Sequence, residues 1–161
     1  MFSPKAVEDG KLLSLFGMIN SAPSAYNLQS YRVFVIKDAA RKEALSVACF
    51  DQSFMNQNFV SKAPVVLVFC ADPGRAGAKY GDRGENLYGL QDATIAATFA
   101  HLAAVDLGLS SVWVGAFKEK EVAALLGLAG LRPVVILPLG YADVVPRQTS
   151  RRPLKEVFIE G

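Results

Sequence analysis

The sequence predicts a mixed α/β domain in which helices pack in layers against a sheet. Four short segments rich in apolar and β-branched residues, at about 31–36, 65–71, 111–115 and 133–140, have the character of strands. Segments with apolar residues at helical spacing alternate with them. The chain has 161 residues, of which 52% are apolar and 20% charged, and this is enough to bury one core. We therefore expect a single domain over residues 1–161.

The first helix is predicted from a set of apolar residues at helical spacing, namely Leu12, Leu15, Phe16 and Ile19. Leu13 and Met18 widen this apolar stripe, so we expect the helix to be covered on more than one side. Pro23 ends it. The small, polar loop that follows, residues 21–30, leads directly into the β-branched strand YRVFVI.

Asp38 is a suitable N-cap for a helix over residues 39–48. The mixed segment that follows, up to residue 62, is consistent with a short helix. The run VVLVFCA lies between Pro64 and Asp72-Pro73-Gly74, and its continuous apolar character predicts a buried strand. Residues 75–89 hold four glycines and many charges, so we expect a mobile surface excursion.

The longest helix is predicted over residues 90–107, with Gly108 at its C-terminal end. Its many alanines give it small apolar groups around most of its surface, so we expect burial on nearly all sides. SSVWVGAF then reads as a strand and a turn, and KEKEVAALLGL as a short amphipathic helix. A last strand, PVVILPLG, precedes a tail that carries prolines and arginines.

Composition excludes several classes of function. The net charge is +2, and no aromatic-basic pattern accompanies the late arginines, so we expect no nucleic-acid partner. No apolar run approaches the ~18 residues of a membrane span, and the N-terminus has no signal pattern, so no membrane association is expected. Two cysteines, Cys49 and Cys70, do not suggest a disulfide scaffold, which favours a reducing cytoplasm.

The side chains offer no obvious catalytic set. The one histidine, His101, lies within an alanine-rich helix, where a packing role is more common than catalysis. Neither a metal-ligand cluster nor a hydrolase or phosphate-binding motif occurs in the sequence. Small polar loops between apolar walls suit cofactor chemistry, in which the bound molecule reacts and the protein supplies shape and electrostatics. For a flavin mononucleotide the candidates are Arg151 at the phosphate, Ser24 and Asn27 for polar contacts, and the glycine turn WVGAF.

Five segments in order resemble the FMN-dependent nitroreductase family. They are APSAYNLQSYRVFVI (22–36), APVVLVFCAD (63–72), LQDATIAATFAHLAAVDLGLSSVWVGAF (90–117), PVVILPLGYADVVP (133–146) and RRPLKEV (151–157). The resemblance implies an α+β sandwich with a central antiparallel-rich sheet flanked by helices, in an intertwined homodimer with two FMN sites at the subunit interface. The alanine-rich helix would then be a dimer-core helix, and the alternative is the central helix of a monomer.

The resemblance also implies site residues. Four loop residues would reach the flavin, commonly that of the partner subunit: Pro23, Ser24, Ala25 and Asn27. A turn would lie against the flavin ring, with a backbone N–H near its reactive nitrogen: Trp113, Gly115 and Ala116. The planar guanidinium of Arg151 would contact the phosphate. Asn56 and Asp92 match positions near the flavin. No side chain is expected to be catalytic, and no metal is expected.

The implied activity is an FMN-dependent oxidoreductase, an enzyme that passes hydride from NADH or NADPH through flavin to a small electron-poor acceptor, such as a nitroaromatic or a quinone, in ping-pong fashion. One departure from the family pattern favours an alternative, and a second concerns the rigidity of the loop. Family members usually begin with an arginine- and serine-rich strand that grips the phosphate, whereas this chain starts at Met1-Phe2-Ser3-Pro4, and Ser30-Tyr31 replaces the usual Pro-Trp. The alternative is a non-catalytic or weakly FMN-binding member of the same fold. A nucleic-acid accessory role has only the basic tail in its favour.

Overall fold

A four-stranded antiparallel sheet forms the centre of the protein. The computed structural model describes residues 2–49, 58–144 and 147–161. The strands are β1 (Tyr31–Ile36), β2 (Val65–Ala71), β3 (Ser110–Ser111) and β4 (Arg132–Gly140), in the order β1-β2-β4-β3. Each neighbouring pair is antiparallel, with Tyr31 opposite Ala71 and Val65 opposite Leu139. The predicted antiparallel-rich sheet is therefore confirmed.

β2 is the central strand, and every one of its residues is buried. Because successive side chains of a strand point to opposite faces, β2 supplies two separate core clusters. Val65, Leu67 and Phe69 pack into one cluster. Val66, Val68 and Cys70 pack into the other. This two-sided burial explains the continuous apolar sequence that predicted the strand.

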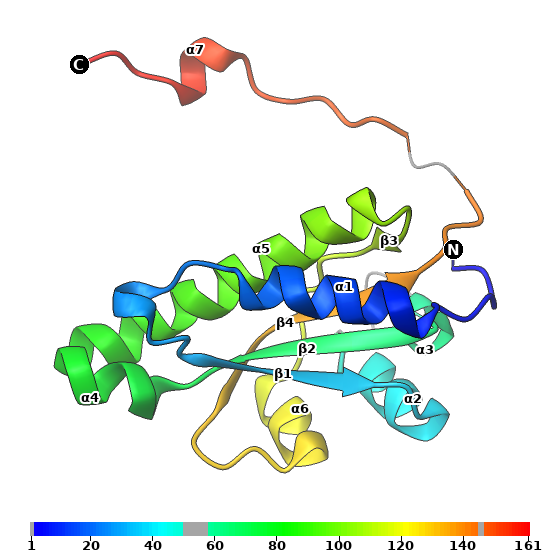
Figure 1. Ribbon diagram of the computed structural model, residues 1–161, viewed down its shortest axis with the longest axis horizontal. Helices are drawn as coiled ribbons and strands as arrows, with labels where there is room; N and C mark the ends of the chain where they lie inside the picture. Colours follow the sequence, from blue (N-terminus) through cyan, green and yellow to red (C-terminus); the bar gives the residue numbers. More distant parts are fainter. Residues whose placement is uncertain (1, 50–57, 145–146) are drawn as a thin grey trace.

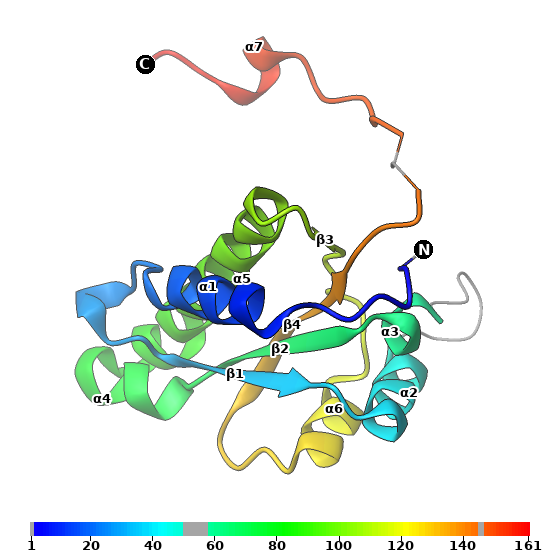
Figure 2. The same cartoon turned by 45° about the vertical axis from the view of Figure 1, so that its right-hand side comes forward.

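Helices cover both faces of the sheet, as Figures 1 and 2 show. α1 (Asp9–Asn20) and α5 (Gly89–Asp106) lie on one face. α2 (Ala39–Ala48), α3 (Phe59–Lys62) and α6 (Glu119–Leu126) pack on the other through the second core cluster. Asp38 caps α2 as predicted, since its side chain accepts the N–H of Arg41 at 2.8 Å.

The segment that the sequence predicted to be a mobile excursion is helical. It forms α4 (Pro73–Arg83) and a single-turn π-helix, η2 (Gly84–Tyr88), which leads into α5. Asp72 caps α4 by accepting the N–H of Arg75 at 3.0 Å, and Pro73 stands at the first helical turn. Glycine at position 84 allows η2 to pack tightly against α4, because a Cβ on Gly84 would stand 2.3 Å from the carbonyl oxygen of Ala76. Gly84, one of the glycines that suggested a loop, therefore serves close helix packing, whereas Gly81 has a positive φ of 55° at a kink in α4.

α1 and α5, which share one face of the sheet, are each buried along one face only. The buried face of α5 carries its alanines, at positions 93, 96, 97, 100, 103 and 104. On the opposite face Leu102 and Val105 are 63% and 67% exposed, and on α1 Leu13 is 70% exposed. For the single chain, the expectations that α1 is covered on more than one side and α5 on nearly all sides are therefore wrong.

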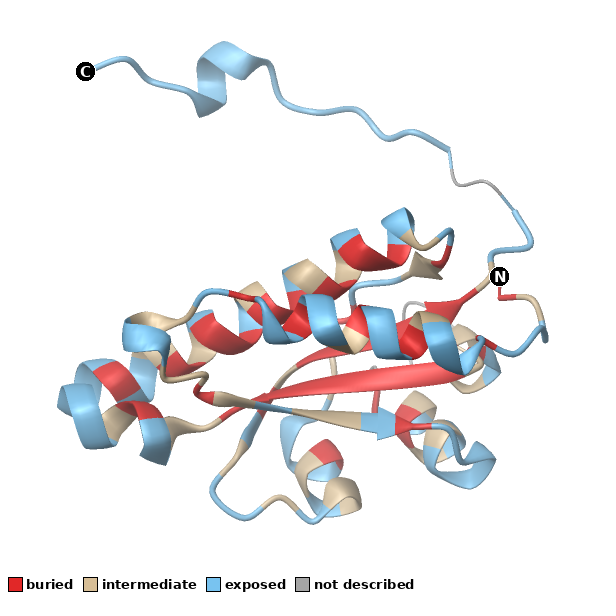
Figure 3. Cartoon of the chain, viewed as in Figure 1, coloured by how far each residue is buried: buried red, intermediate tan, exposed pale blue. Residues whose placement is uncertain are grey.

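The C-terminal arm, residues 147–161, extends away from the sheet and contains one short helix, α7 (Leu154–Val157). All of its residues are exposed (Figure 3). They include apolar side chains that a single chain leaves in water, namely Leu154, Val157, Phe158 and Ile159. Among the helices of the described chain, none is long and apolar enough to cross a membrane. The assignment of all 161 residues to one domain stays a prediction.

Candidate functional site

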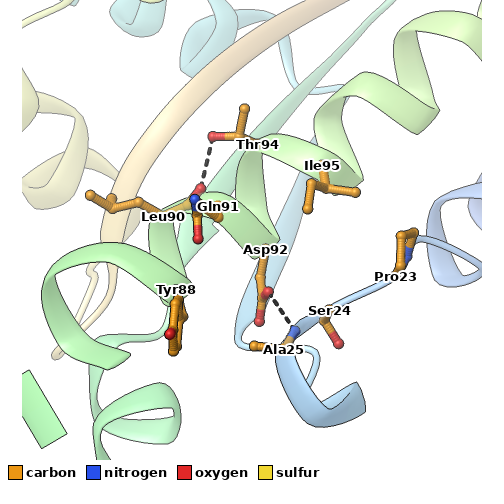
Figure 4. Close-up of a pocket in the computed structure, with 9 residues that line it drawn as sticks. All are labelled: Pro23, Ser24, Ala25, Tyr88, Leu90, Gln91, Asp92, Thr94 and Ile95. Carbon is orange, nitrogen blue, oxygen red and sulfur yellow. Dashed lines mark hydrogen bonds between the residues drawn. The ribbon is translucent and has the colours of Figure 1, made fainter. Parts of the chain in front are cut away.

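A large pocket opens between the loop after α1 and the beginning of α5. Its volume is about 540 Å³, which lies in the range of small-molecule and cofactor sites. Nine residues line it (Figure 4): Pro23, Ser24, Ala25, Tyr88, Leu90, Gln91, Asp92, Thr94 and Ile95. Three of the predicted loop residues and Asp92 therefore meet at one cavity.

The loop that forms one wall of this pocket has an unusual backbone. It contains a 3-10 turn, η1 (Ala25–Asn27). Three non-glycine residues have positive φ angles: Tyr26 at 54°, Asn27 at 55° and Gln29 at 51°. Such conformations cost of order 1 kcal/mol or more each and persist only where surrounding contacts hold them. The loop is therefore fixed by its neighbours rather than by the preferences of its own residues.

Asp92 of α5 holds the loop from one side. Its Oδ1 accepts the N–H of Ala25 at 3.0 Å, and its Oδ2 accepts the N–H of Ser30 at 3.2 Å. Figure 4 shows the carboxylate pointing from α5 to the loop. Only 2% of Asp92 is exposed, and no cationic side chain of the described residues pairs with it. Burial and the charge of this carboxylate raise the pKa of Tyr31, which follows the loop.

Side chains inside the loop add further bonds. The Oγ of Ser24 accepts the N–H of Gln29 at 2.9 Å. The side-chain amide of Gln29 donates to Oδ1 of Asn27 at 3.2 Å. Both predicted polar residues therefore have structural duties, although the hydroxyl hydrogen of Ser24 is still free to donate towards a ligand.

α4 holds the loop from the other side. The Nε–H of Arg75 donates to the carbonyl of Leu28 at 2.5 Å, and the N–H of Asp72 donates to the carbonyl of Ser30 at 2.9 Å. The ammonium of Lys79 lies 4.2 Å from the centre of the Tyr26 ring. The segment 75–89, which we expected to be a mobile excursion, thus forms a helix that supports the candidate site.

The turn after β3 brings a second set of predicted residues near the same region. Val114 pairs with Ile136 of β4 through two backbone hydrogen bonds of 3.0 Å. Beyond this bridge the chain leaves the sheet, and Gly115 and Ala116 are exposed. Within the described chain neither of their backbone N–H groups has an acceptor. Both are therefore available to a ligand.

Leu90 connects the two sets of residues. It lines the large pocket and also a smaller one of about 210 Å³, whose wall includes Gly115. Trp113, on the same turn, is 41% exposed and lines neither of the two. Leu90 therefore links the loop and the start of α5 to the Gly115 turn, and the smaller pocket is also lined by the charged residues Glu119 and Arg132.

Arg151 and Asn27 line neither of these two pockets. Arg151 lies on the C-terminal arm, where its Nη1 donates to Oγ1 of Thr149 at 2.6 Å. Asn27 is exposed and does not line the large pocket. Asn56 lies outside the residues that the structure describes. No lysine or arginine is among the described residues that line the large pocket, so a phosphate group has no cation there.

Sequence reasoning missed several lining residues, chiefly Tyr88 and Leu90. Tyr88 is held by an edge-to-face contact with Tyr80, with ring centres 5.0 Å apart, and its hydroxyl accepts from Nε of Arg83 at 2.9 Å. The sequence held one usable signal, the Asp72-Pro73 helix start, which predicts a helix in place of a loop. The contact of Leu90 with the loop is tertiary and has no sequence signal.

Among the described residues, neither a group of metal ligands nor a histidine lies at the large pocket. The described residues contain no group of three or more histidine, cysteine or acidic side chains that could hold a metal. His101 is half-buried, and its Nδ1 lies 2.6 Å from Oγ of Ser111, so it links α5 to β3. The packing interpretation of this histidine agrees with that contact.

Proteins of similar sequence are known from bacteria. An NADH dehydrogenase of Thermus thermophilus is 30% identical over 95% of this chain and 86% of its own. An FMN reductase [NAD(P)H] of Bacillus subtilis is 32% identical over 86% of this chain, which spans only 57% of that longer protein.

Structural similarity extends over nearly the whole chain. The NADPH:FMN oxidoreductase of Vibrio harveyi, solved in complex with NAD+, superimposes with a TM-score of 0.87 at 26% identity, covering 99% of this chain and 71% of the other. The family model described as Nitroreductase family matches residues 1–141, which include the sheet, the helices around it and the pocket. With its antiparallel sheet and the pocket at the start of α5, the chain belongs to the nitroreductase family.

Proposed function

We propose that the protein is an FMN-dependent oxidoreductase that takes hydride from NADH or NADPH and passes it to a small electron-poor acceptor such as a nitroaromatic or a quinone. The observation that carries the proposal is the surface shared by the loop, the start of α5 and the Gly115 turn. Support comes from relatives named as an FMN reductase [NAD(P)H] and an NADPH:FMN oxidoreductase. FMN when bound supplies the acceptance and donation of hydride.

The residues present fit the flavin ring. Leu90 and Ile95 offer apolar walls, and Tyr88 offers an aromatic one. The free N–H groups of Gly115 and Ala116 suit a ring nitrogen or carbonyl, since a backbone donor without an acceptor in the protein is satisfied by a ligand. The Ser24 hydroxyl suits a polar ring edge. In this proposal the chain binds and orients, and no side chain acts as a general acid or base.

The proposed active form is a homodimer. The exposed Leu102 and Val105 of α5 and Leu13 of α1 are apolar groups that a second copy would cover. The C-terminal arm carries exposed apolar side chains beside Arg151 and Arg152, and an arm of this kind gains stability only by packing on another surface. Arg151 would then bring a cation to a phosphate that the large pocket itself does not provide.

A cytoplasmic location is part of the proposal. Cys49 and Cys70 are free thiols in the second core cluster. Burial raises the pKa of each to about 12, so both are held as neutral thiols. Unpaired cysteines are normal in a reducing compartment and agree with that location.

A second candidate function has one observation in its favour. Because no cation of the described residues lines the large pocket, a member of the fold that binds FMN weakly, or not at all, is the alternative. One experiment separates the two. The protein is purified with added FMN, desalted, and its visible spectrum is recorded. A retained flavin band that bleaches anaerobically with NADH or NADPH, and returns when a quinone is added, supports the enzyme; a colourless protein without saturable FMN binding supports the alternative.

A further inference from the structure

Two polar side chains are buried within the described chain, those of Ser30 and Asp92, and they belong to residues that contact each other. Asp92 accepts the backbone N–H of Ser30, while the hydroxyl of Ser30 has no hydrogen-bond partner among the described residues. A buried carboxylate is costly unless its oxygens are bonded. Here both carboxylate oxygens of Asp92 are bonded: Oδ1 accepts the N–H of Ala25, and Oδ2 accepts the N–H of Ser30.

The two N–H groups stand at opposite ends of the strained part of the loop. Between them lie the three residues with positive φ, Tyr26, Asn27 and Gln29. One rigid group on α5 therefore fixes both ends of a segment whose own residues favour other conformations. Two other bonds reach the same loop: the side chain of Arg75 is exposed, so its bond is exchangeable with water, and the N–H of Asp72 holds only the Ser30 end.

We propose that Asp92 is a positioning residue, which acts on the ligand through the loop: its carboxylate holds residues 24–30 in the strained conformation that presents Ser24 and Ala25 to the pocket. The proposal deepens the proposed function and rests on it for the identity of the ligand. Released from Asp92, the loop would populate relaxed conformations. The affinity for a ligand falls in proportion to the population that remains competent.

The choice of aspartate follows from the donors it faces. Asparagine has the same shape but only one acceptor oxygen, and its NH2 group would confront the N–H of Ala25 or of Ser30. Glutamate is longer by one methylene in a fully packed position. Only an ionised aspartate offers two charged acceptors at this site, and bonds to a charged acceptor are the stronger kind.

The test compares the unsubstituted protein with Asp92→Asn and with the matched control Asp9→Asn, which makes the same chemical change at an exposed position of α1. Amide hydrogen exchange is measured without FMN at Ala25 and Ser30, with β2 amides as internal reference. FMN affinity is measured by quenching of flavin fluorescence, and visible circular dichroism reports the contacts of the bound flavin.

We expect Asp92→Asn to speed exchange at Ala25 or Ser30, to raise the FMN dissociation constant about tenfold, equal to about 1.4 kcal/mol, and to change the flavin dichroism, with β2 unaffected. Asp9→Asn should leave all three unchanged. Unchanged exchange in Asp92→Asn overturns the proposal, as does faster exchange with unaltered FMN affinity. If Asp92→Asn does not fold, unprotected Ala25 and Ser30 amides in the unsubstituted protein overturn it. Should that protein bind no FMN, the proposed function fails, while the exchange data still decide whether Asp92 holds the loop.

Discussion

The Oγ of Ser24 accepts the backbone N–H of Gln29 at 2.9 Å, and this bond closes the loop that lines the pocket. It explains why a small hydroxyl residue precedes β1 in a chain so apolar elsewhere. The oxygen serves the fold, and accepting this bond leaves the hydroxyl hydrogen available to a ligand. In the proposed function, one side chain would therefore combine a structural and a binding role.

Ser24→Ala should weaken both roles. We expect the free energy of unfolding to fall by about 0.5–1.5 kcal/mol, the usual net contribution of a hydrogen bond, and the FMN dissociation constant to rise several-fold. Urea denaturation and flavin-fluorescence titration measure the two effects. Ser21→Ala is the control, because its exposed Oγ only donates back to Gly17 within the preceding helix. Equal effects of the two substitutions would contradict a special role for Ser24.

Glu8 provides a pH-dependent prediction away from the pocket. The Tyr141 hydroxyl donates to its carboxylate, and this bond, with help from the backbone and from Lys5, lowers the pKa of Glu8 to about 2. A carboxyl with a depressed folded-state pKa stabilises the fold above its ordinary pKa and loses that effect as the pH falls from about 4.5 to about 2.

Tyr141→Phe should therefore raise the pKa of Glu8 towards its ordinary value, as followed by NMR titration of the carboxyl carbon. The acid-induced loss of stability between pH 4.5 and 2 should become shallower. Lys5→Met is the comparison, and its effect on the Glu8 pKa should be smaller because the tyrosine bond is the larger cause. A pKa of Glu8 that stays unchanged without the tyrosine hydroxyl would refute this explanation.

The close packing of η2 on α4 allows a prediction about the stability of the fold. A Cβ at Gly84 would meet the carbonyl oxygen of Ala76 at 2.3 Å, and backbone atoms cannot simply rotate aside. Gly84→Ala should lower the free energy of unfolding by about 1–3 kcal/mol, as overpacking usually does, and should displace Tyr88 from the pocket wall. In the control Gly10→Ala the new methyl group meets nothing within 4 Å, so stability should be kept or raised. If Gly84→Ala leaves the free energy of unfolding unaltered, α4 and η2 are not closely packed.

Strong local patterns made most of the sheet predictable from sequence. β1 and β2 have the predicted bounds, because β-branched and apolar residues are confined to them by clear turn signals. α4 was missed because its glycines and charges resemble a loop, while its helix start at Asp72-Pro73 carried less weight. The role of Gly84 became clear only from its contact with Ala76, which joins residues eight positions apart.

The candidate site was predictable only in part, for a related reason. Ser24 and Ala25 followed from a resemblance, and they do line the pocket. Sequence does not show that Asp92 would turn to the loop backbone, since its two donors lie more than sixty residues earlier in the chain. Nor does it show the left-handed conformation of Tyr26, which is enforced from α4 and α5.

The proposed dimer predicts the effect of a charge on the exposed face of α5. Leu102 is 63% exposed, and a lysine there would be tolerated in a monomer but would bury a charge at the interface. Light scattering at micromolar concentration should give the dimer mass for the unsubstituted protein and a shift towards the monomer for Leu102→Lys. Val47→Lys, at a position 66% exposed on α2, across the sheet, should leave the mass unchanged. A monomer mass for the unsubstituted protein would end the dimer proposal.

Arg151 tests whether the C-terminal arm contributes to the flavin site. Its guanidinium contacts only Thr149 and Ser150 within the described chain, so its planar donors are largely available for a phosphate. Arg151→Ala should raise the FMN dissociation constant at least about tenfold, the loss expected for one charge-assisted hydrogen bond. Arg41→Ala on α2 removes the same charge far from the pocket and should change the constant little. Because riboflavin lacks the phosphate, its affinity should be equal in Arg151→Ala and in the unsubstituted protein. An unchanged FMN constant, or an equal loss for riboflavin, would exclude Arg151 as the phosphate ligand.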